Sequence, residues 1–319
     1  MNFPYAAILR NAYELTRNHF QLWVFGIFIS AATWLNFLLL NIAFDRRELV
    51  DFDSSEFVSK LQSIADSPLA IANLFVVVII LFFSALSKAT VVWSAQKLAG
   101  RQQWASDQKK EFSVKTALKE GGKYAGTIFW LQLLVLFLLL LLVISIAAPV
   151  VYLAVIGQIG RAVALTFLGM AILVPVSILL GYMFIYSPIF AVLYRVKARA
   201  ALGLAFGLAQ NKLKESLILG AFLVGISLLF MTGLAFGIIV VSVPVAFLSL
   251  VFAQIGLTWA VYMLVFVTAF LGLCAVVILL AGLTVFNNCV WVLAVMEMVK
   301  TEKADEDTKV FTAEVEPAS

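Results

Sequence analysis

Long apolar stretches without a charged residue alternate with short polar segments along most of this chain. The uncharged stretches cover residues 18–44, 67–87, 124–160, 162–194 and 216–296. A helix needs about 20 predominantly apolar residues to cross a bilayer, and the last stretch is long enough to cross it twice. The pattern therefore predicts six transmembrane helices, near residues 20–42, 69–93, 126–154, 163–193, 217–249 and 259–293.

Three amphipathic segments precede the first, third and fifth of these spans, and they share one spacing. Each has an apolar residue, two further residues, an alanine followed by a large apolar residue, four further residues, and then Asn or Lys. The three sets are Leu9, Ala12, Tyr13 and Asn18; Val114, Ala117, Leu118 and Lys123; and Leu202, Ala205, Phe206 and Asn211. Apolar residues at helical spacing with basic residues between them are typical of a helix that lies in the membrane interface.

The two patterns together predict an all-α fold, a polytopic transmembrane helical bundle of six spans. It consists of three repeated units, each an amphipathic helix plus a helical hairpin, near residues 1–100, 110–198 and 199–299. We expect a compact bundle with approximate threefold order about the membrane normal. Residues 1–299 then form a single integral membrane domain, and residues 300–319, which are polar and acidic, form a disordered cytoplasmic tail.

The composition of the chain indicates that it lies in a lipid bilayer rather than in water. Of the 319 residues, 63% are hydrophobic and only 13% are charged, and the mean hydropathy is +1.05. Soluble domains carry roughly 25% charged residues. A chain of this composition cannot keep its apolar surface in a water-facing core, so we expect a multi-pass membrane protein.

The basic residues are distributed unevenly among the predicted loops. Residues 96–124 hold seven basic residues against three acids, and residues 195–215 hold five against one, whereas residues 44–68 hold three against six. Lys and Arg in short loops favour the cytoplasmic side. We therefore expect a cell-membrane location with both termini in the cytoplasm, and anionic lipids beside the basic loops. A net charge of only +4 in membrane-proximal loops does not favour nucleic-acid binding.

The even-numbered spans share a weak polar band toward the cytoplasm, formed by Lys88, Tyr186, Ser187, Asn287 and Asn288. Lys88 is the only charged residue placed inside a span, and an intramembrane charge suggests a functional site. Its position near the cytoplasmic end also allows it to reach the interface along its own stem, or to serve helix packing. The asparagine amides need partners in lipid, which either interhelical hydrogen bonds or a polar ligand would supply.

Residues that would support catalysis or hold a cofactor are scarce. The chain has one histidine, His19, at the start of the first span, and no predicted span contains a carboxylate. A histidine-rich metal site and an intramembrane acid/base pair therefore cannot be built there. No phosphate-binding loop occurs, since KEGGKYAG lacks the leading Gly and the Ser or Thr. We expect no enzyme activity and no cofactor.

The lead-ins ILRNAYELTRNHF and ALGLAFGLAQNKL, each followed by a span, a return span and a basic linker, carry a resemblance to a known family. Over most of residues 5–299 the pattern resembles the membrane-domain family of the glycerophosphoryl diester phosphodiesterases and related uncharacterised six-helix bacterial membrane proteins. The resemblance implies a prokaryotic inner-membrane module. It does not imply phosphodiesterase activity, because that activity belongs to a separate soluble domain.

Two functions of different classes fit these observations. The first is a non-enzymatic membrane module that organises lipids or partner proteins, which the basic interfacial helices favour. The second is a small transporter or channel that uses the polar band of the second, fourth and sixth spans. The sequence leaves the substrate, the partner and the oligomeric state open.

Overall fold

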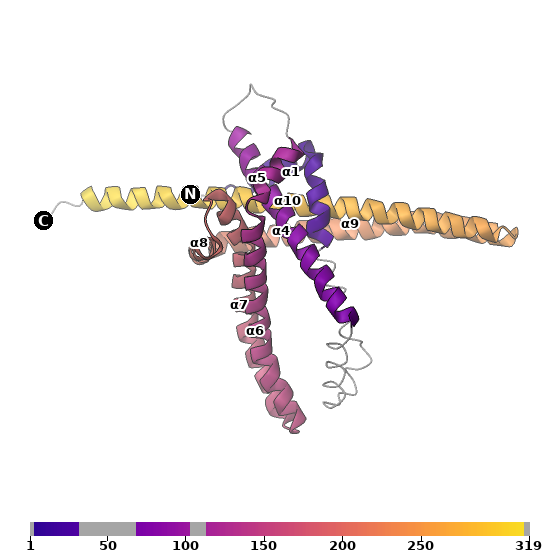
Figure 1. The fold of residues 1–319 in the computed structure, drawn as a ribbon, viewed down its shortest axis with the longest axis horizontal. Coiled ribbons are helices and arrows are strands. Elements are labelled where there is room, and N and C mark those ends of the chain that lie inside the picture. Colours follow the sequence, from indigo (N-terminus) through magenta and orange to yellow (C-terminus); the bar gives the residue numbers. More distant parts are fainter. Residues whose placement is uncertain (1–2, 32–67, 103–112, 316–319) are drawn as a thin grey trace.

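The computed structural model describes residues 3–31, 68–102 and 113–315 of the chain, and its side chains are described for residues 3–31, 75–100 and 113–301. Every regular element in these ranges is a helix. In chain order they are α1 (Tyr5–Asn18), the short 3-10 helix η1 (Phe20–Leu22), α4 (Pro68–Gln102), α5 (Val114–Gly122), α6 (Ala125–Val155), α7 (Ile159–Leu193), α8 (Ala198–Asn211), α9 (Leu213–Gln254) and α10 (Thr258–Val315). Figure 1 shows their arrangement.

Five of the predicted spans fall in helices that are long and apolar enough to cross a membrane, α4, α6, α7, α9 and α10. This confirms the sequence analysis for residues 69–93 and for the four spans after them. The first predicted span begins in a shorter apolar helix, Phe20–Ala31, and its remainder lies outside the described residues.

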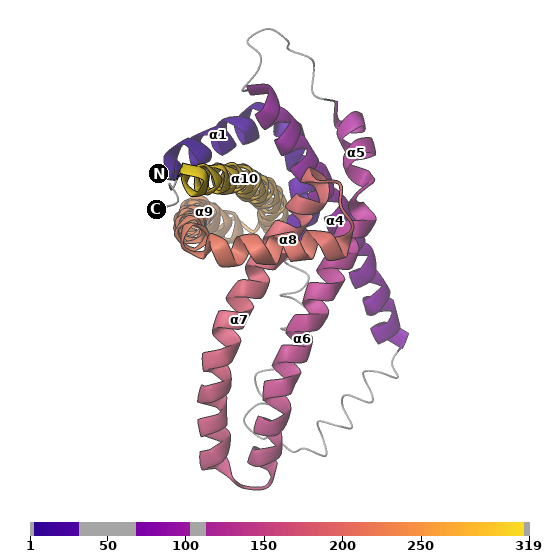
Figure 2. The same cartoon turned by 90° about the vertical axis from the view of Figure 1, so that its left-hand side faces the viewer.

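The packed core lies where the helices cross, in a region that we call the hub. It contains residues 85–95 of α4, 182–192 of α7 and 285–298 of α10, together with the buried faces of α1 and α8. Figure 2 shows α1, α5 and α8 gathered around the hub, with the α6–α7 hairpin extending away from it. The hub therefore joins the amphipathic helices to the second, fourth and sixth predicted spans.

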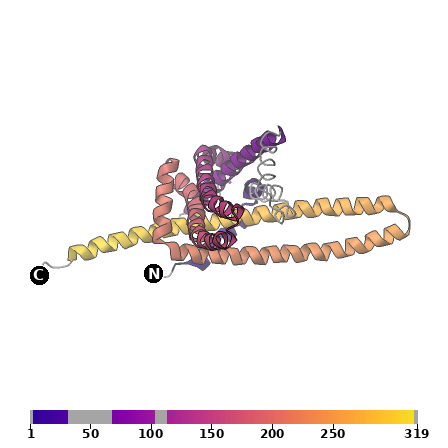
Figure 3. The same ribbon diagram turned by 90° about the horizontal axis from the view of Figure 1, so that it is seen from below.

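The helices do not form the compact bundle that we expected. Hairpin α6–α7 and hairpin α9–α10 leave the hub in different directions and diverge (Figures 1 and 3). In the most apolar window of α4, 39% of the residues are buried, against at most 6% in the other four long helices. Lipid solvates apolar side chains as well as another helix does, so no hydrophobic force draws the distal halves together.

The length of the hairpin helices is consistent with this divergence. At 1.5 Å per residue, the 42 residues of α9 extend about 63 Å, and the hydrocarbon core is only about 30 Å thick. Helices longer than the bilayer is thick cross it at a tilt.

Both described hairpins close with the same turn. Gly157 and Gly256 have φ of +76° and +77°, the left-handed conformation that favours glycine. In the first turn, the Gly157 amide donates to the Ala154 carbonyl and the Gln158 amide to the Leu153 carbonyl; the second turn has the same bonds at Gly256 and the residue after it. These are the two bonds of the Schellman motif, which satisfies carbonyls at a helix end.

Each amphipathic helix packs against one even-numbered span through small residues. Helix α1 contacts α10, α5 contacts α4, and α8 contacts α7. The alanines of the repeated spacing, Ala12, Ala117 and Ala205, have no exposed surface. The residues that follow them are 56%, 41% and 40% exposed in α1, α5 and α8, so the three helices present matching buried and exposed faces.

The N-terminal segment that follows η1 packs against α10. A Cβ on Gly282 would lie 3.0 Å from ring atoms of Trp23, and one on Gly26 would collide with the backbone of α10 at Ala281. The absence of side chains at both glycines lets the start of the first span approach α10 closely. Segments at opposite ends of the sequence are thereby joined.

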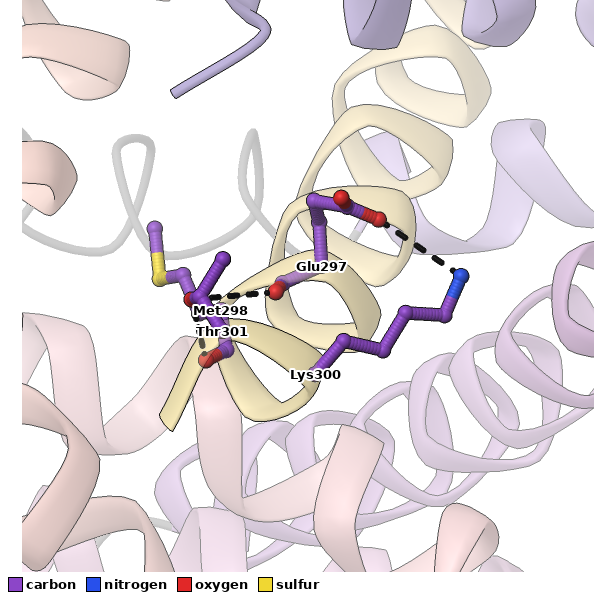
Figure 4. Close-up of polar contacts among 4 residues, drawn as sticks. All are labelled: Glu297, Met298, Lys300 and Thr301. Carbon is purple, nitrogen blue, oxygen red and sulfur yellow. Dashed lines mark hydrogen bonds and ion pairs between the residues drawn. The ribbon is translucent and has the colours of Figure 1, made fainter. Parts of the chain in front are cut away.

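Helix α10 continues to Val315, whereas the sequence analysis predicts a disordered tail from residue 300. Lys300 Nζ lies 3.5 Å from Glu297 Oε2, and the Thr301 hydroxyl donates to the carbonyls of Glu297 (3.2 Å) and Met298 (2.8 Å), as Figure 4 shows. These contacts stay within one helical turn and support the helix where the span ends. The structure thus has a helix over residues 300–315, where we expected disorder.

Close packing of α5 on α4 gives a testable prediction. A Cβ on Gly121 would lie 2.6 Å from the Thr90 Cα, so Gly121→Ala must push the two helices apart. We expect it to lower the free energy of unfolding by about 1–3 kcal/mol, measured by denaturant titration in detergent. Gly126→Ala is the matched control, because a Cβ there meets no atom within 4 Å. Equal stability of the two variants would contradict this packing.

Candidate functional site

A cavity of about 240 Å³ lies in the hub between α4, α7 and α10. These helices carry the second, fourth and sixth predicted spans, which is where the polar band is expected. Helix α10 contributes the largest polar share of the lining. The lining residues are Lys88 and Val92 of α4, Phe184, Ile185, Pro188 and Ile189 of α7, and Thr284, Asn287, Asn288 and Trp291 of α10.

Lys88 points its ammonium group at an aromatic ring rather than at a carboxylate. Its Nζ lies 4.0 Å from the centroid of the Phe184 ring, in a cation–π contact across the cavity wall. Among the described side chains, Lys88 makes no ion pair. Such a contact contributes about 0.5–2 kcal/mol, and it supplies no hydrogen-bond acceptor, so the N–H donors of the ammonium can still bind an anion.

The two asparagines differ in how their amides are satisfied. Asn288 donates through Nδ2 to the Thr284 carbonyl at 2.7 Å, one turn earlier in the same helix. The Oδ1 of Asn287 is buried and has no hydrogen-bond partner. A buried acceptor without a partner costs roughly 1–3 kcal/mol, and this one belongs to a residue that lines the cavity.

Tyr186 and Ser187, the other two members of the predicted polar band, do not line the cavity. Tyr186 is fully buried, and its hydroxyl donates to Ser216 Oγ of α9 at 2.6 Å. Its ring also packs against Trp291, with centroids 5.7 Å apart. Ser187 donates to the Met183 carbonyl in its own helix. Tyr186 therefore links α7 to α9 and α10, whereas the Ser187 hydroxyl bonds within α7.

Sequence reasoning missed the aromatic and apolar wall of the cavity. Thr284 and Trp291 lie one turn before Asn288 and one turn after Asn287, and Phe184 lies one turn before Pro188. Residues four apart share one helix face. The positions of the asparagines therefore already indicated that Thr284 and Trp291 lie beside them on α10. The predicted polar band places Lys88 at the same level as the asparagines, but the sequence did not indicate that Phe184 and Trp291 would line the cavity between them.

The surface around the hub is basic. Exposed Lys and Arg side chains occur on or beside all three amphipathic helices: Arg17, Lys115, Lys119, Lys197, Arg199 and Lys214. Two of the acids nearby are already paired, Glu14 with Arg10 at 3.0 Å and Glu120 with Lys123 at 2.7 Å. The hydrogen bond from Lys123 lowers the pKa of the Glu120 carboxyl. Those acids do little to offset the remaining cations.

The part of the chain that the structure describes has no group of three or more His, Cys, Asp or Glu side chains placed to hold a metal ion. His19 lies between α1 and η1, where burial lowers the pKa of its imidazole.

No family model, no curated protein and no solved structure matches this chain. The resemblance to the phosphodiesterase membrane domains therefore remains a hypothesis, and the functional argument rests on the geometry.

Proposed function

We propose that the chain is a non-enzymatic, multi-pass module of the cell membrane that organises anionic lipids at its cytoplasmic surface, and through them partner proteins. In this proposal six spans form three repeated units, with both termini in the cytoplasm. One observation carries it. Three amphipathic helices each bury small residues against an even-numbered span and expose a large apolar residue beside basic ones.

That arrangement suits a helix at the boundary of the bilayer. Tyr13, Leu118 and Phe206 are exposed large apolar side chains that gain contact with acyl chains. Arg17, Lys119 and Arg199 lie on or next to the same helices and reach anionic head groups. Each Lys or Arg near an anionic surface contributes about 1 kcal/mol, so several of them enrich anionic lipid around the hub.

Neutralising the surface cations should reduce that enrichment. We expect the combined variant Lys115→Gln, Lys119→Gln and Arg199→Gln to lose about 1 kcal/mol of lipid preference per residue, roughly fivefold each. The measurement is the ratio of phosphatidylglycerol to phosphatidylethanolamine that is extracted with the protein in polymer-bounded bilayer discs. Arg161→Gln, beside the α6–α7 turn on the predicted outer side, is the control. A ratio unchanged from wild type in the triple variant would refute the lipid role.

The orientation and the number of crossings have their own test. In a background with Cys274→Ser and Cys289→Ala, single cysteines replace Lys119, Gln158 and Lys60. A membrane-impermeant maleimide added to intact cells should label position 158 and position 60, and it should leave position 119 unlabelled until the cells are opened. Labelling at 158 without labelling at 60 would contradict the proposed topology, because α4 would then not cross between positions 60 and 119.

A transporter or channel is the alternative, and the cavity is the observation that favours it. A polar cavity where three spans converge offers Lys88 and Asn287 as contacts for a small solute. If transport is the function, solute flux into proteoliposomes should disappear with Lys88→Ala and with Asn287→Leu. Wild-type flux in both variants would exclude the cavity as a route.

A further inference from the structure

The level of the cavity in the membrane follows from the amphipathic helices that pack around it. Helix α5 crosses α4 where Gly121 meets the backbone of Thr90. Lys88 precedes Thr90 by two residues, which is about 3 Å along the helix axis. If α5 lies in the interface, Lys88 lies only slightly deeper, at the depth of lipid head groups.

The contact between α1 and α10 places Asn287 at the same relative level. The Thr16 side chain of α1 lies next to the Cys289 thiol of α10. Thr16 follows Ala12 by four residues, just as Gly121 follows Ala117, and Asn287 precedes Cys289 by two residues. Lys88 and Asn287 therefore stand in equivalent places on two even-numbered predicted spans, and both residues line one cavity.

The two polar groups demand different partners. The Lys88 ammonium has no carboxylate among the described side chains and attracts an anion. The Oδ1 of Asn287 can only accept, so it needs a hydroxyl or an N–H donor. A single ligand that satisfies both carries an anionic oxygen and a hydroxyl group a short distance away.

The size of the cavity limits the ligand further. A volume of about 240 Å³ lies below the 300–1,000 Å³ of sites that enclose a drug-sized molecule. It accommodates a polar head group whose attached chains remain outside. Phe184 and Trp291 give the cavity an apolar wall suited to the carbon atoms of such a group.

We propose that the hub cavity binds a phosphate ester that carries free hydroxyl groups, with the phosphate at the Lys88 ammonium and a hydroxyl at the Asn287 amide. The ester is either the head group of a lipid such as phosphatidylglycerol or a soluble polyol phosphate. This inference deepens the proposed function, because it adds one stoichiometric site to a surface that enriches anionic lipid.

Native mass spectrometry of the full chain in detergent tests the site with defined probes. The probes are phosphatidylglycerol, phosphatidic acid, which lacks the hydroxyl groups, phosphatidylcholine, and glycerol 1-phosphate as a competitor. We expect one phosphatidylglycerol to bind preferentially, and Lys88→Met to weaken it at least tenfold. Asn287→Leu should abolish the preference for phosphatidylglycerol over phosphatidic acid. Competition by glycerol phosphate would identify the soluble ester as the source, and its absence would identify the lipid.

Two variants serve as matched controls. Lys97→Met removes an exposed cation on the same helix that also lies over an aromatic ring, with Nζ 4.5 Å from the Trp93 centroid. Gln132→Leu removes another buried amide oxygen that has no partner, and it lies outside the cavity lining. Both should bind phosphatidylglycerol as the wild type does.

Thermal unfolding without lipid provides a second measurement. Lys88→Met removes a half-buried charge that has no carboxylate partner among the described side chains, so its melting temperature should rise while the stabilisation by phosphatidylglycerol disappears. Wild-type affinity in Lys88→Met, or equal binding of phosphatidylcholine, would overturn the proposal. The triple surface variant separates the two proposals, because it leaves the cavity intact. If that variant binds one phosphatidylglycerol and the wild type shows no enrichment of anionic lipid, only the surface role is refuted.

Discussion

Close approach of helices at small side chains is the constraint on which the rest of the structure depends. Within a bilayer, helices gain little by hiding apolar surface from lipid, so association relies on close contact and on hydrogen bonds. Ala12, Ala117 and Ala205 provide that contact for the amphipathic helices. At Gly121 the approach is so close that α5 touches the backbone of α4. The hub exists because these positions carry little or no side chain.

The same packing determines which polar groups are satisfied and which remain available. The Tyr186 hydroxyl of α7 donates a hydrogen bond to Ser216 Oγ of α9 inside the hub. Lys88 and Asn287 line a cavity instead, where the Lys88 ammonium lies over an aromatic ring and the buried Oδ1 of Asn287 has no hydrogen-bond partner. Unsatisfied polar groups are costly in an apolar setting. A bound polar ligand offsets that cost, and this connects the packing of the hub to a function.

The divergent hairpins extend this argument to the rest of the molecule. Their distal halves carry large apolar side chains that are mostly exposed, such as Phe167 at 74% and Tyr262 at 75%. Lipid is a sufficient partner for such residues, so nothing requires the hairpins to meet. The prediction of a compact bundle from three similar units assumed that apolar helix surfaces associate with one another, as they do in water. The turns at Gly157 and Gly256 share one conformation and the sequence Ala-x-Ile-Gly, a similarity that the predicted repeat spacing does not include.

The sequence by itself determined the solvent, the helical class and the positions of five spans, because these depend on runs of apolar residues that are local along the chain. It also indicated Lys88, Asn287 and Asn288 as unusual residues within spans. Only the tertiary structure decided that these three share a cavity while Tyr186 and Ser187 bond elsewhere. It alone decided that α10 continues through the tail to Val315 and that the hairpins diverge. Those outcomes depend on which helix faces meet, and residues two hundred positions apart carry no local signal of their contact.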